Sequence, residues 1–364
     1  MRCSLEREIF ADVLETVVMI IPGKTTYPVF ENVLLEITPG RLALTAADGD
    51  TVVHKEVRLE GKVEEGKALV NGRRLAELVR SSQSTDVVIR RVENRVRFEA
   101  GRMKADFVHL APEEFPELPK MPEDITFDFP LGLLFEMFDA CEFAVSKDEG
   151  RPLMTAINWE IGKNETKMVA TDSYRLGLIT RKLKLPVKTG LLITPKAIKI
   201  LPRGEEKVRV FSDLKLVGLK LENMVVISKM IEGQYPEYER VIPKGLPNRA
   251  VIQKEELGAV VRRALIFANP FGKQISLEFS PRALMVRAES HEVGKSEEEL
   301  DCHYEGESLK VGFNGGYLLE ILQHISTEQV SVELSSPMSP AVFKPVDSQS
   351  DGEDIYVLMP VRLD

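Results

Sequence analysis

The chain repeats itself three times, and this repetition limits its fold more than any other feature. Three similar apolar segments, NVLLEI, AINWEI and QISLEF, begin at residues 32, 156 and 274. A second set follows at nearly the same spacing, and in LTAADGD, MVATDSY and MVRAESH an apolar stretch runs into a short polar turn. The period of about 120 residues is much longer than a solenoid repeat and long enough for its own core. We therefore expect three duplicated domains.

Each repeat is expected to contain two helices. The first has apolar residues at helical spacing, over residues 6–20, 131–144 and 255–267. The second follows Asn71, Thr194 and Asn314, whose side chains can accept hydrogen bonds from the first free N–H groups of a helix. Pro195 stands at the first helical position, which proline favours.

The rest of each repeat alternates apolar and polar residues, as strands do. In residues 87–100, VVIRRVENRVRFEA, two such arms flank a tight turn, and residues 208–221 repeat this pattern. Proline-rich joints at 111–124 and 235–249 mark the borders. The sequence predicts an α+β fold of three repeated domains, at residues 1–120, 121–243 and 244–364, each with two helices packed on antiparallel sheets.

Composition is that of an ordinary globular protein, with 43% apolar and 29% charged residues. No apolar run is long enough to span a bilayer, and acidic residues interrupt the start of the chain where a signal peptide needs an apolar core. Cys3, Cys141 and Cys302 are far apart, which argues against a disulfide framework or a zinc knuckle. We expect a cytoplasmic protein with reduced cysteines and no membrane partner.

Residues 23–25, Gly-Lys-Thr, look like the end of a phosphate-binding P-loop. The full motif needs a glycine five positions before Gly23, where the chain has Val18, and Pro22 has no N–H group to offer a phosphate. A nucleotide site is therefore rejected. Comparable joints before the first segment of the other repeats also carry basic residues, Lys147 with Arg151, and Lys273. The same kind of joint therefore carries a basic tip in all three repeats, and the phosphate that it would meet stays open from these residues alone.

No catalytic or metal-binding constellation is evident. The five histidines are scattered, and the adjacent Cys302 and His303 would point to opposite faces of a strand. The acidic run SEEELD, residues 296–301, lacks the glycine and ligand spacing of a calcium loop and is more typical of a solvated edge or a charged interface. The sequence predicts a protein that is not an enzyme and has no cofactor or metal.

Basic residues recur beside the second helix of repeats one and two: Arg73, Arg74, Arg80, Lys196, Lys199 and Arg203. An ordinary solvated helix face and a shared binding surface both explain this pattern. The third repeat departs from it, with Gly316 and Tyr317 in place of charge, although its first helix supplies Lys254, Arg262 and Arg263.

Four stretches together resemble the bacterial DNA sliding clamps, the beta subunits of DNA polymerase III. They are TDSYRL (171–176), EGQYPEYERVIP (232–243), FNGGYLLEIL (313–322) and VLMPVRL (357–363). The resemblance covers the whole chain and implies a processivity factor: a homodimer of chains paired head to tail, forming a six-domain ring around double-stranded DNA. It also implies tethering of the replicative DNA polymerase and other replication or repair proteins, and a separate ATP-driven clamp loader.

In clamps, partners insert a short apolar peptide between the second and third domains. The resemblance implies a partner-peptide pocket built from Met154, Thr171, Ser173, Tyr174, Arg175, Leu176, Pro236, Arg240, Val241, Met338, Val357, Leu358, Met359, Pro360, Val361 and Arg362. Methionine and proline suit an adaptable apolar floor, the three arginines are expected to offer donors at its rim, and Tyr174 is expected to gate it. The alternative is that the Met-Pro-Val tail is a last core strand.

Two further surfaces follow from the resemblance. The DNA-facing residues would be Lys24, Arg73, Arg80, Lys147, Arg151, Lys196, Lys199, Arg203, Arg262 and Lys273. The dimer interface would contain Arg74, Ala105, Phe107, Ile266 and Phe267, with SEEELD facing Arg102 and Lys104. A closed ring holds DNA by topology, so a modest basic lining suffices despite the net charge of −9. Some acidic residues of the first helix, such as Asp12 and Glu15, must then face away from the bore.

Rival functions belong to other classes. A P-loop ATPase would need the missing glycine and would bind ATP. A DNA-binding regulator would need a recognition helix, which is not apparent. A scaffold without DNA would ignore DNA topology.

Overall fold

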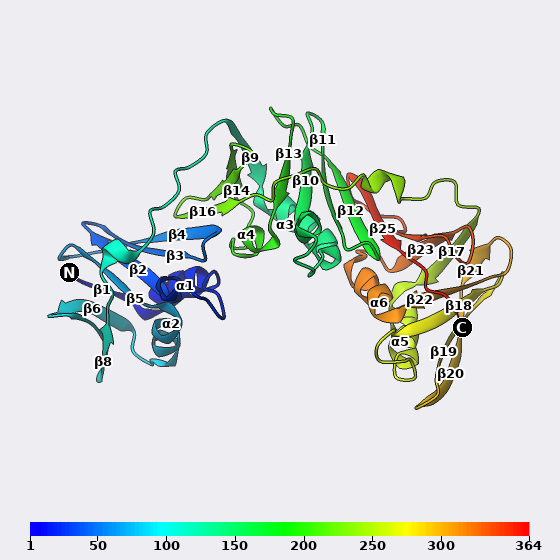
Figure 1. Cartoon of the computed structure of the whole chain (residues 1–364), viewed down its shortest axis with the longest axis horizontal. Helices are drawn as coiled ribbons and strands as arrows, with labels where there is room; N and C mark the ends of the chain where they lie inside the picture. Colours follow the sequence, from blue (N-terminus) through cyan, green and yellow to red (C-terminus); the bar gives the residue numbers. More distant parts are fainter. Residues whose placement is uncertain (364) are drawn as a thin grey trace. The chain divides into compact units, whose positions relative to one another are not determined.

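The computed structural model describes residues 1–363, and Asp364, the last residue of the third predicted domain, lies outside them (Figure 1). Repeat one contains β1 (Arg2–Glu6), α1 (Arg7–Val18), β2 (Asn32–Thr38), β3 (Arg41–Ala47), β4 (Thr51–Arg58), β5 (Gly66–Asn71), α2 (Gly72–Ser81), β6 (Asp86–Val92), β7 (Arg95–Ala100) and β8 (Met103–Val108). Repeat two contains β9 (Ile125–Pro130), α3 (Leu131–Cys141), β10 (Ile157–Ile161), β11 (Glu165–Thr171), β12 (Arg175–Lys182), β13 (Thr189–Ile193), α4 (Pro195–Lys199), β14 (Lys207–Ser212), β15 (Leu216–Lys220) and β16 (Met224–Lys229). Repeat three contains β17 (Asn248–Gln253), α5 (Lys254–Ala264), β18 (Gln274–Phe279), β19 (Ala283–Ser290), β20 (Gly294–Asp301), β21 (His303–Glu305), β22 (Leu309–Asn314), α6 (Gly315–His324), β23 (Gln329–Leu334), β24 (Ala341–Pro345) and β25 (Gly352–Leu358).

The predicted threefold repeat is confirmed. Each repeat runs strand, helix, three-stranded meander, strand, helix and second meander, and only repeat three adds a short strand, β21, within residues 1–363. Short 3₁₀ turns supplement this order, among them Pro28–Glu31, Glu142–Ala144 and Tyr238–Arg240. The two helices and the antiparallel strands of each repeat match the predicted α+β class.

Strands of neighbouring repeats join into shared sheets. The third strand of the first meander pairs with the third strand of the next repeat's second meander: β4 with β16 and β12 with β25. These pairings complete an eight-stranded sheet, β5-β2-β3-β4-β16-β15-β14-β9, and a nine-stranded sheet, β13-β10-β11-β12-β25-β24-β23-β17-β21. Two four-stranded sheets, β1-β6-β7-β8 and β20-β19-β18-β22, complete the fold.

The described chain divides into two compact units, each built around one shared sheet. The first unit contains residues 1–133 and 193–230, and the second contains residues 134–192 and 231–364. The middle repeat is thus divided between the units because each of its meanders belongs to a different shared sheet. The predicted boundaries at 120 and 243 stay a prediction.

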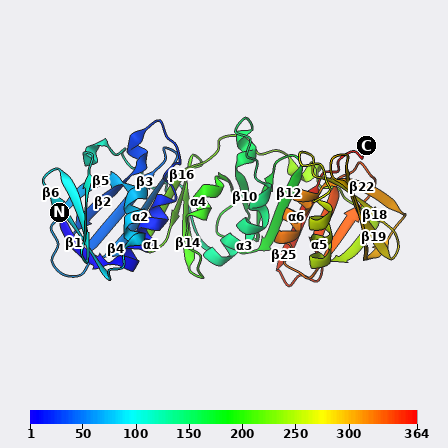
Figure 2. The ribbon, with the colours of Figure 1, turned by 90° about the horizontal axis from the view of Figure 1, so that it is seen from below.

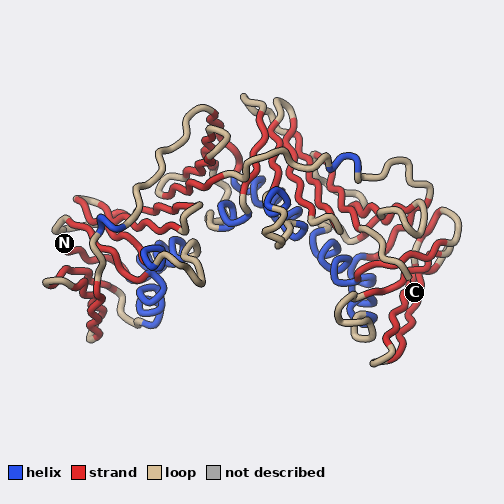
Figure 3. The backbone as a smooth tube through the Cα atoms, viewed as in Figure 1, coloured by secondary structure: helices blue, strands red, loops and turns tan. Residues whose placement is uncertain are grey.

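In the first unit, α1 and α2 pack side by side, and α1 also packs on β3 and β4 (Figure 3). The buried face of α1 carries Phe10, Val13, Leu14 and Val17. On its other side, Asp12 accepts a hydrogen bond of 2.7 Å from the buried ammonium of Lys55, and Glu15 pairs with Arg80 at 2.9 Å. Asp12 and Glu15 therefore form ion pairs with basic residues of the same unit.

In the second unit, α5 and α6 lie side by side (Figure 2). The helix α5 packs on β17, β19 and β20, while α6 packs on β22 and β25. Trp159 of β10 is fully buried, and its indole N–H donates to Thr166 Oγ1 at 2.9 Å. No helix within residues 1–363 is long and apolar enough to cross a membrane.

The predicted helix caps are partly confirmed. Asn71 Oδ1 accepts from the N–H of Arg74, and Asn314 Oδ1 accepts from the N–H groups of Gly316 and Tyr317. The expected cap by Thr194 is wrong, because its hydroxyl lies 3.4 Å from Ser228 Oγ and no cap bond forms. The helix that follows, α4, has only five residues.

A buried ion pair fastens β12 to β25 in the second unit. Arg181 Nη1 lies 2.5 Å from Asp354 Oδ1, and both side chains are almost fully buried. Arg181 Nε also donates to Glu136, which is half exposed, at 2.7 Å. Removing one member of a buried pair leaves an uncompensated charge in a medium of low polarity, which is costly.

We predict that Asp354→Asn lowers the free energy of unfolding of the second unit by about 3 kcal/mol, because Arg181 loses its buried counter-charge. The measurement is urea unfolding followed by circular dichroism. The matched control is Asp128→Asn, which breaks the largely exposed pair with Arg209 and should cost less than about 1 kcal/mol. Equal shifts in the two variants would contradict the prediction.

Candidate functional site

The β11–β12 turn, residues 171–176, is held by its own polar side chains. Asp172 Oδ1 accepts hydrogen bonds of 2.9 Å from the N–H groups of Tyr174 and Arg175. Thr171 Oγ1 donates to the Arg175 carbonyl at 2.8 Å and accepts from the N–H of Ser173, which has φ +78°. The left-handed backbone at Ser173 makes the turn tight and leaves the ring of Tyr174 exposed to solvent.

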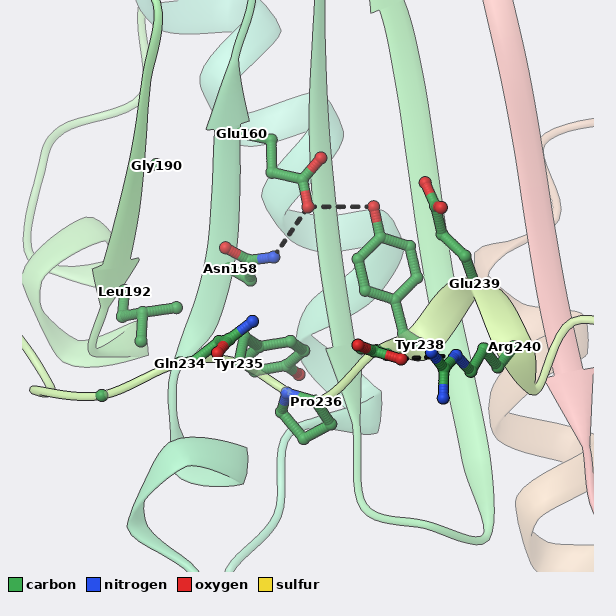
Figure 4. Close-up of a pocket in the computed structure, with 12 residues that line it drawn as sticks. Asn158, Glu160, Gly190, Leu192, Gln234, Tyr235, Pro236, Tyr238, Glu239 and Arg240 are labelled. Carbon is green, nitrogen blue, oxygen red and sulfur yellow. Dashed lines mark hydrogen bonds and ion pairs between the residues drawn. The ribbon is translucent and has the colours of Figure 1, made fainter.

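Residues 233–241 cross the face of the nine-stranded sheet and are attached to it by two tyrosines (Figure 4). Both rings are buried. The phenol oxygen of Tyr235 accepts a hydrogen bond of 3.1 Å from the N–H of Thr171, and the Tyr238 hydroxyl donates to Glu160 Oε1 at 3.0 Å. The repeated tyrosine of YPEYER therefore fixes this segment beside the β11–β12 turn.

The C-terminal tail continues past the last strand. Strand β25 ends at Leu358, after which the N–H of Met359 donates to the Tyr174 carbonyl at 2.8 Å. The N–H of Val361 donates to the Gly312 carbonyl at 2.8 Å, and Gln274 Nε2 donates to the Arg362 carbonyl at 2.6 Å. The Met-Pro-Val tail is thus not part of a core strand. It passes over the surface from the turn to β22.

These three segments meet over one apolar cluster. It is formed by Ala156, Val169, Leu176, Leu178, Leu192, Tyr235, Tyr238, Val342 and Val357. Leu153, Ile231, Ile242, Leu246 and Ile355 pack against it while half exposed. Above this floor the apolar side chains of Tyr174, Val241 and Met359 remain exposed. An apolar floor with exposed apolar side chains around it is suited to binding apolar groups of a partner.

Arg175 does not lie at a rim, as the sequence interpretation expected. Its side chain is 8% exposed, and its guanidinium contacts Asp172 at 3.2 Å and Glu320 of α6 at 2.5 Å. The guanidinium carbon also lies 4.3 Å from the centre of the Tyr317 ring and 5.3 Å from that of Phe143. Arg175 is therefore a buried support that ties the β11–β12 turn to α6, because a guanidinium can stack and pair at once.

The other predicted pocket residues differ in their exposure and in their contacts with the turn. Arg240 and Arg362 are exposed, and Arg240 pairs with Glu237. Met154 Sδ lies 3.4 Å from Ser173 Oγ, so Met154 borders the turn. Pro236 and Pro360 are half buried, whereas Leu358 is fully buried. Met338 is an exposed residue between β23 and β24.

The predicted DNA-facing residues fall into three groups. Lys24, Lys147, Arg262 and Lys273 are exposed and have no ion pair within residues 1–363. Four others form hydrogen bonds or ion pairs within the chain. Arg73 donates to the Ile21 carbonyl, and Lys196 donates to the Ile20 carbonyl and to Asp48. Arg80 donates to Glu15, and Arg151 donates to Asp148 and Ser173. Lys199 and Arg203 are exposed and have further contacts. Lys24 and Lys273 lie in loops between a helix and a strand, as expected.

The predicted dimer residues lie at the ends of the two four-stranded sheets. Ala105 and Phe107 are half buried on β8, the last strand of one sheet. Arg74 is an exposed residue of α2. Ile266 and Phe267 follow α5, which packs on β20 at the end of the other sheet, and Ile266 is largely exposed.

The sequence interpretation missed several residues that build the site. Asp172 shapes the turn, Tyr235 and Tyr238 attach the crossing segment, and Phe143 with Glu320 surround Arg175. An aspartate two positions before the turn's tyrosine was a usable signal, because aspartate often accepts from nearby backbone N–H groups. Contacts such as Arg175 with Glu320, 145 residues apart, leave no local signal.

Burial raises the pKa of both attaching tyrosines. For Tyr238 the nearby carboxylate of Glu160 adds to this effect on the pKa, because a phenolate beside it would be repelled. For Tyr235 the hydrogen bond from the Thr171 N–H opposes the rise in pKa in part. Within residues 1–363 no group of three or more His, Cys, Asp or Glu side chains is arranged to hold a metal ion.

The fold and this site define a protein of three repeats that share sheets, with an exposed apolar surface beside the β11–β12 turn. Models of the N-terminal, central and C-terminal domains of the DNA polymerase III beta subunit match residues 1–119, 130–237 and 239–362. The chain belongs to this family, the bacterial sliding clamps.

Relatives and solved structures match this chain over their full lengths. The beta sliding clamps of Haemophilus influenzae and Pseudomonas putida are 26% and 28% identical to this chain, with 100% of each chain covered. The crystal structure of a Pseudomonas aeruginosa sliding clamp bound to griselimycin has a TM-score of 0.94 at 28% identity, again over 100% of both chains. A Thermotoga maritima beta subunit, 23% identical, has the same fold with a TM-score of 0.94.

We predict that stability falls as the pH rises above about 10, the ordinary pKa of tyrosine. A folded-state pKa above the unfolded value means that the unfolded chain loses the proton first, so the contribution of Tyr238 is complete below pH 10 and lost above it. Urea unfolding at pH 8, 10 and 11 measures this. Tyr238→Phe should reduce the fall, whereas Tyr27→Phe, an exposed control, should not. An equal fall in all three proteins would contradict the prediction.

Proposed function

We propose that this protein is a DNA polymerase processivity factor: a ring-shaped homodimer that encircles double-stranded DNA, slides along it and tethers the replicative polymerase and other replication or repair proteins. Membership of the sliding-clamp family supports this function, and the family is non-catalytic. The protein would work in the cytoplasm and would be placed on DNA by a separate clamp loader.

The strand pairing between repeats carries the proposal of a ring. In this chain β4 pairs with β16 and β12 with β25, always the third strand of a first meander with the third strand of a second. The corresponding strands at the two ends are β20, the third strand of the first meander in repeat three, and β8, the third strand of the second meander in repeat one. Both lie at a sheet edge and have no such partner within residues 1–363. Exposed strand edges readily pair with another chain. A head-to-tail dimer would pair β20 of each copy with β8 of the other and close a ring.

Charge and apolar exposure at these edges favour this dimer. On β20, Glu297 and Glu298 already pair with Arg287 and Arg263, while Glu299 has no ion pair within residues 1–363. Lys104 of β8 is exposed and also has no ion pair there. Opposite charges around an apolar centre are typical of specific interfaces. Ile266 and Phe107 would supply that centre.

The DNA contact is proposed to be weak and independent of sequence. The exposed lysines at 24, 147 and 273 lie in loops, where they can meet phosphates without a fixed geometry. Phosphate contacts position a protein on DNA but carry no base information. A ring needs no more than this, because its closure keeps the DNA inside.

The apolar cluster described above is proposed as the pocket for partner peptides. Val357 and Leu176 belong to its buried floor, and Tyr174 and Met359 stand exposed beside it. The N–H of Met359 donates to the carbonyl of Tyr174, so the tail and the turn would move together when a peptide enters. Several partners could share the pocket because apolar contacts impose little geometry.

The ring predicts that retention depends on DNA topology. A clamp loader places the protein on nicked circular DNA, the circle is cut at one site, and the protein that remains bound is measured at moderate salt. We expect retention on the circle and loss from the linear form, since the ring slides off an open end. Persistence on linear DNA without blocked ends would contradict the ring.

The same assay has an interface control. Ile266→Glu places a charge at the proposed centre of the dimer and should give a monomer in sedimentation that is not retained on circles. Val293→Glu, a change at an exposed apolar residue of the β19–β20 turn, should leave both properties unchanged.

The pocket predicts a separate loss of function. Replacing Val241 and Met359 by alanine should weaken binding of a labelled peptide with leucine and phenylalanine side chains by at least about tenfold, because both are exposed apolar residues at the cluster. Fluorescence anisotropy measures the affinity. The dimer should persist in sedimentation. Unchanged peptide affinity, or loss of the dimer, would contradict the assignment of these residues.

A further inference from the structure

A hollow lies beside the apolar cluster of the proposed peptide pocket and shares residues with it. It has a volume of about 690 Å³ and lies between residues 233–240 and the strands β10 and β13 (Figure 4). Pro236 and Arg240 line this hollow and are also among the residues assigned to the peptide pocket. The two attached tyrosines, Tyr235 and Tyr238, line it as well. A peptide chain leaving the pocket across this segment would enter the hollow.

The hollow presents hydrogen-bond acceptors. Asn158 is 8% exposed, and its Nδ2 donates to Glu160 Oε1 at 3.0 Å, while its Oδ1 has no partner within residues 1–363. Glu160 Oε1 also accepts from the Tyr238 hydroxyl, which leaves Oε2 of this carboxylate to accept from a ligand. Glu239 adds an exposed carboxylate. This oxygen is open to solvent, because Arg90 Nε is the only buried side-chain nitrogen or oxygen without a hydrogen-bond partner within residues 1–363, so a ligand with N–H groups can reach it.

No cation within residues 1–363 neutralises these acceptors. Arg240, the one basic residue of the described chain that lines the hollow, pairs with Glu237. Lys167 stands opposite Glu160 in the sheet register, but its ammonium pairs with Glu165 at 3.5 Å. Glu160 and Glu239 therefore have no ion pair within residues 1–363.

We propose that this hollow binds an arginine or lysine side chain from the partner segment that flanks the apolar peptide in the proposed pocket. The inference rests on the proposed peptide pocket and adds a specificity for basic flanking residues. A guanidinium offers N–H donors for Asn158 Oδ1 and the carboxylates at once, and the tyrosine rings can contact its planar face. Partners with acidic flanks are disfavoured by the same charges.

The test compares labelled peptides that share one apolar core of leucine and phenylalanine residues. The core carries a Gly-Arg-Arg, Gly-Ser-Ser or Gly-Glu-Glu extension, attached to each end in turn, and affinities are measured by fluorescence anisotropy on the full-length protein. We expect the arginine extension at one end to bind about fivefold tighter than the serine extension at low salt. The glutamate extension should bind more weakly than either.

Two variants locate the effect. In the double variant Glu160→Gln and Glu239→Gln, the preference for arginine over serine should fall to about twofold or less, while the bare core keeps its affinity. The substituted amide at position 160 retains an oxygen that can accept the bonds from Tyr238 and Asn158, so the fold should persist, as measured by circular dichroism. Glu232→Gln is the control, because Glu232 is exposed directly before this segment and does not line the hollow.

The outcomes separate this inference from the proposed function. Equal affinities of the three extended peptides would overturn the basic-residue site while leaving the peptide pocket intact. A preference that Glu232→Gln reduces as much as the double variant would also overturn it, since the effect would then be the general attraction of an acidic protein. Failure of the bare core to bind would overturn the pocket itself.

Discussion

Pairing of strands between repeats is the interaction on which the rest of the structure depends. Seven residue pairs join β12 to β25, from Arg175↔Leu358 to Arg181↔Gly352, and five join β4 to β16. Without these ladders the repeats would be separate domains on linkers, free to move, as most domains are. Backbone hydrogen bonds in a ladder fix both register and direction. Each unit is consequently organised around one continuous sheet to which two repeats contribute.

The candidate site is a direct consequence of the β12–β25 ladder. Its register sets Arg175, at the start of β12, opposite Leu358, at the end of β25. The turn before β12 and the tail after β25 must then emerge at the same end of the sheet, where Met359 bonds to Tyr174. The crossing segment completes the site through Tyr235 and Tyr238. No single repeat contains the candidate site, so its formation requires the two repeats to be joined.

The repeat, the helices and the α+β class could be predicted because they arise from local patterns that occur three times. Caps at Asn71 and Asn314 were also local and correct, whereas Thr194 found a better partner in Ser228, a residue brought near only by the fold. The placement of Arg175 failed for the same reason: Glu320, Tyr317 and Phe143 come from distant parts of the chain. Motif resemblance provided the residues of the site but not which of them are supports and which are exposed.

Internal ion pairing changes how the charge of this protein should be understood. Many arginines and lysines near the helices are already used, such as Arg80 with Glu15 and Lys196 with Asp48. The excess of acidic over basic residues therefore lies at the surface. There it repels DNA phosphates, and salt limits the distance over which this repulsion acts. The exposed loop lysines proposed to meet DNA, such as Lys24 and Lys273, would act only at short range, because salt screens their charge. A protein with a net charge of −9 is expected to bind DNA weakly from solution, so closure around the duplex would be what keeps it there.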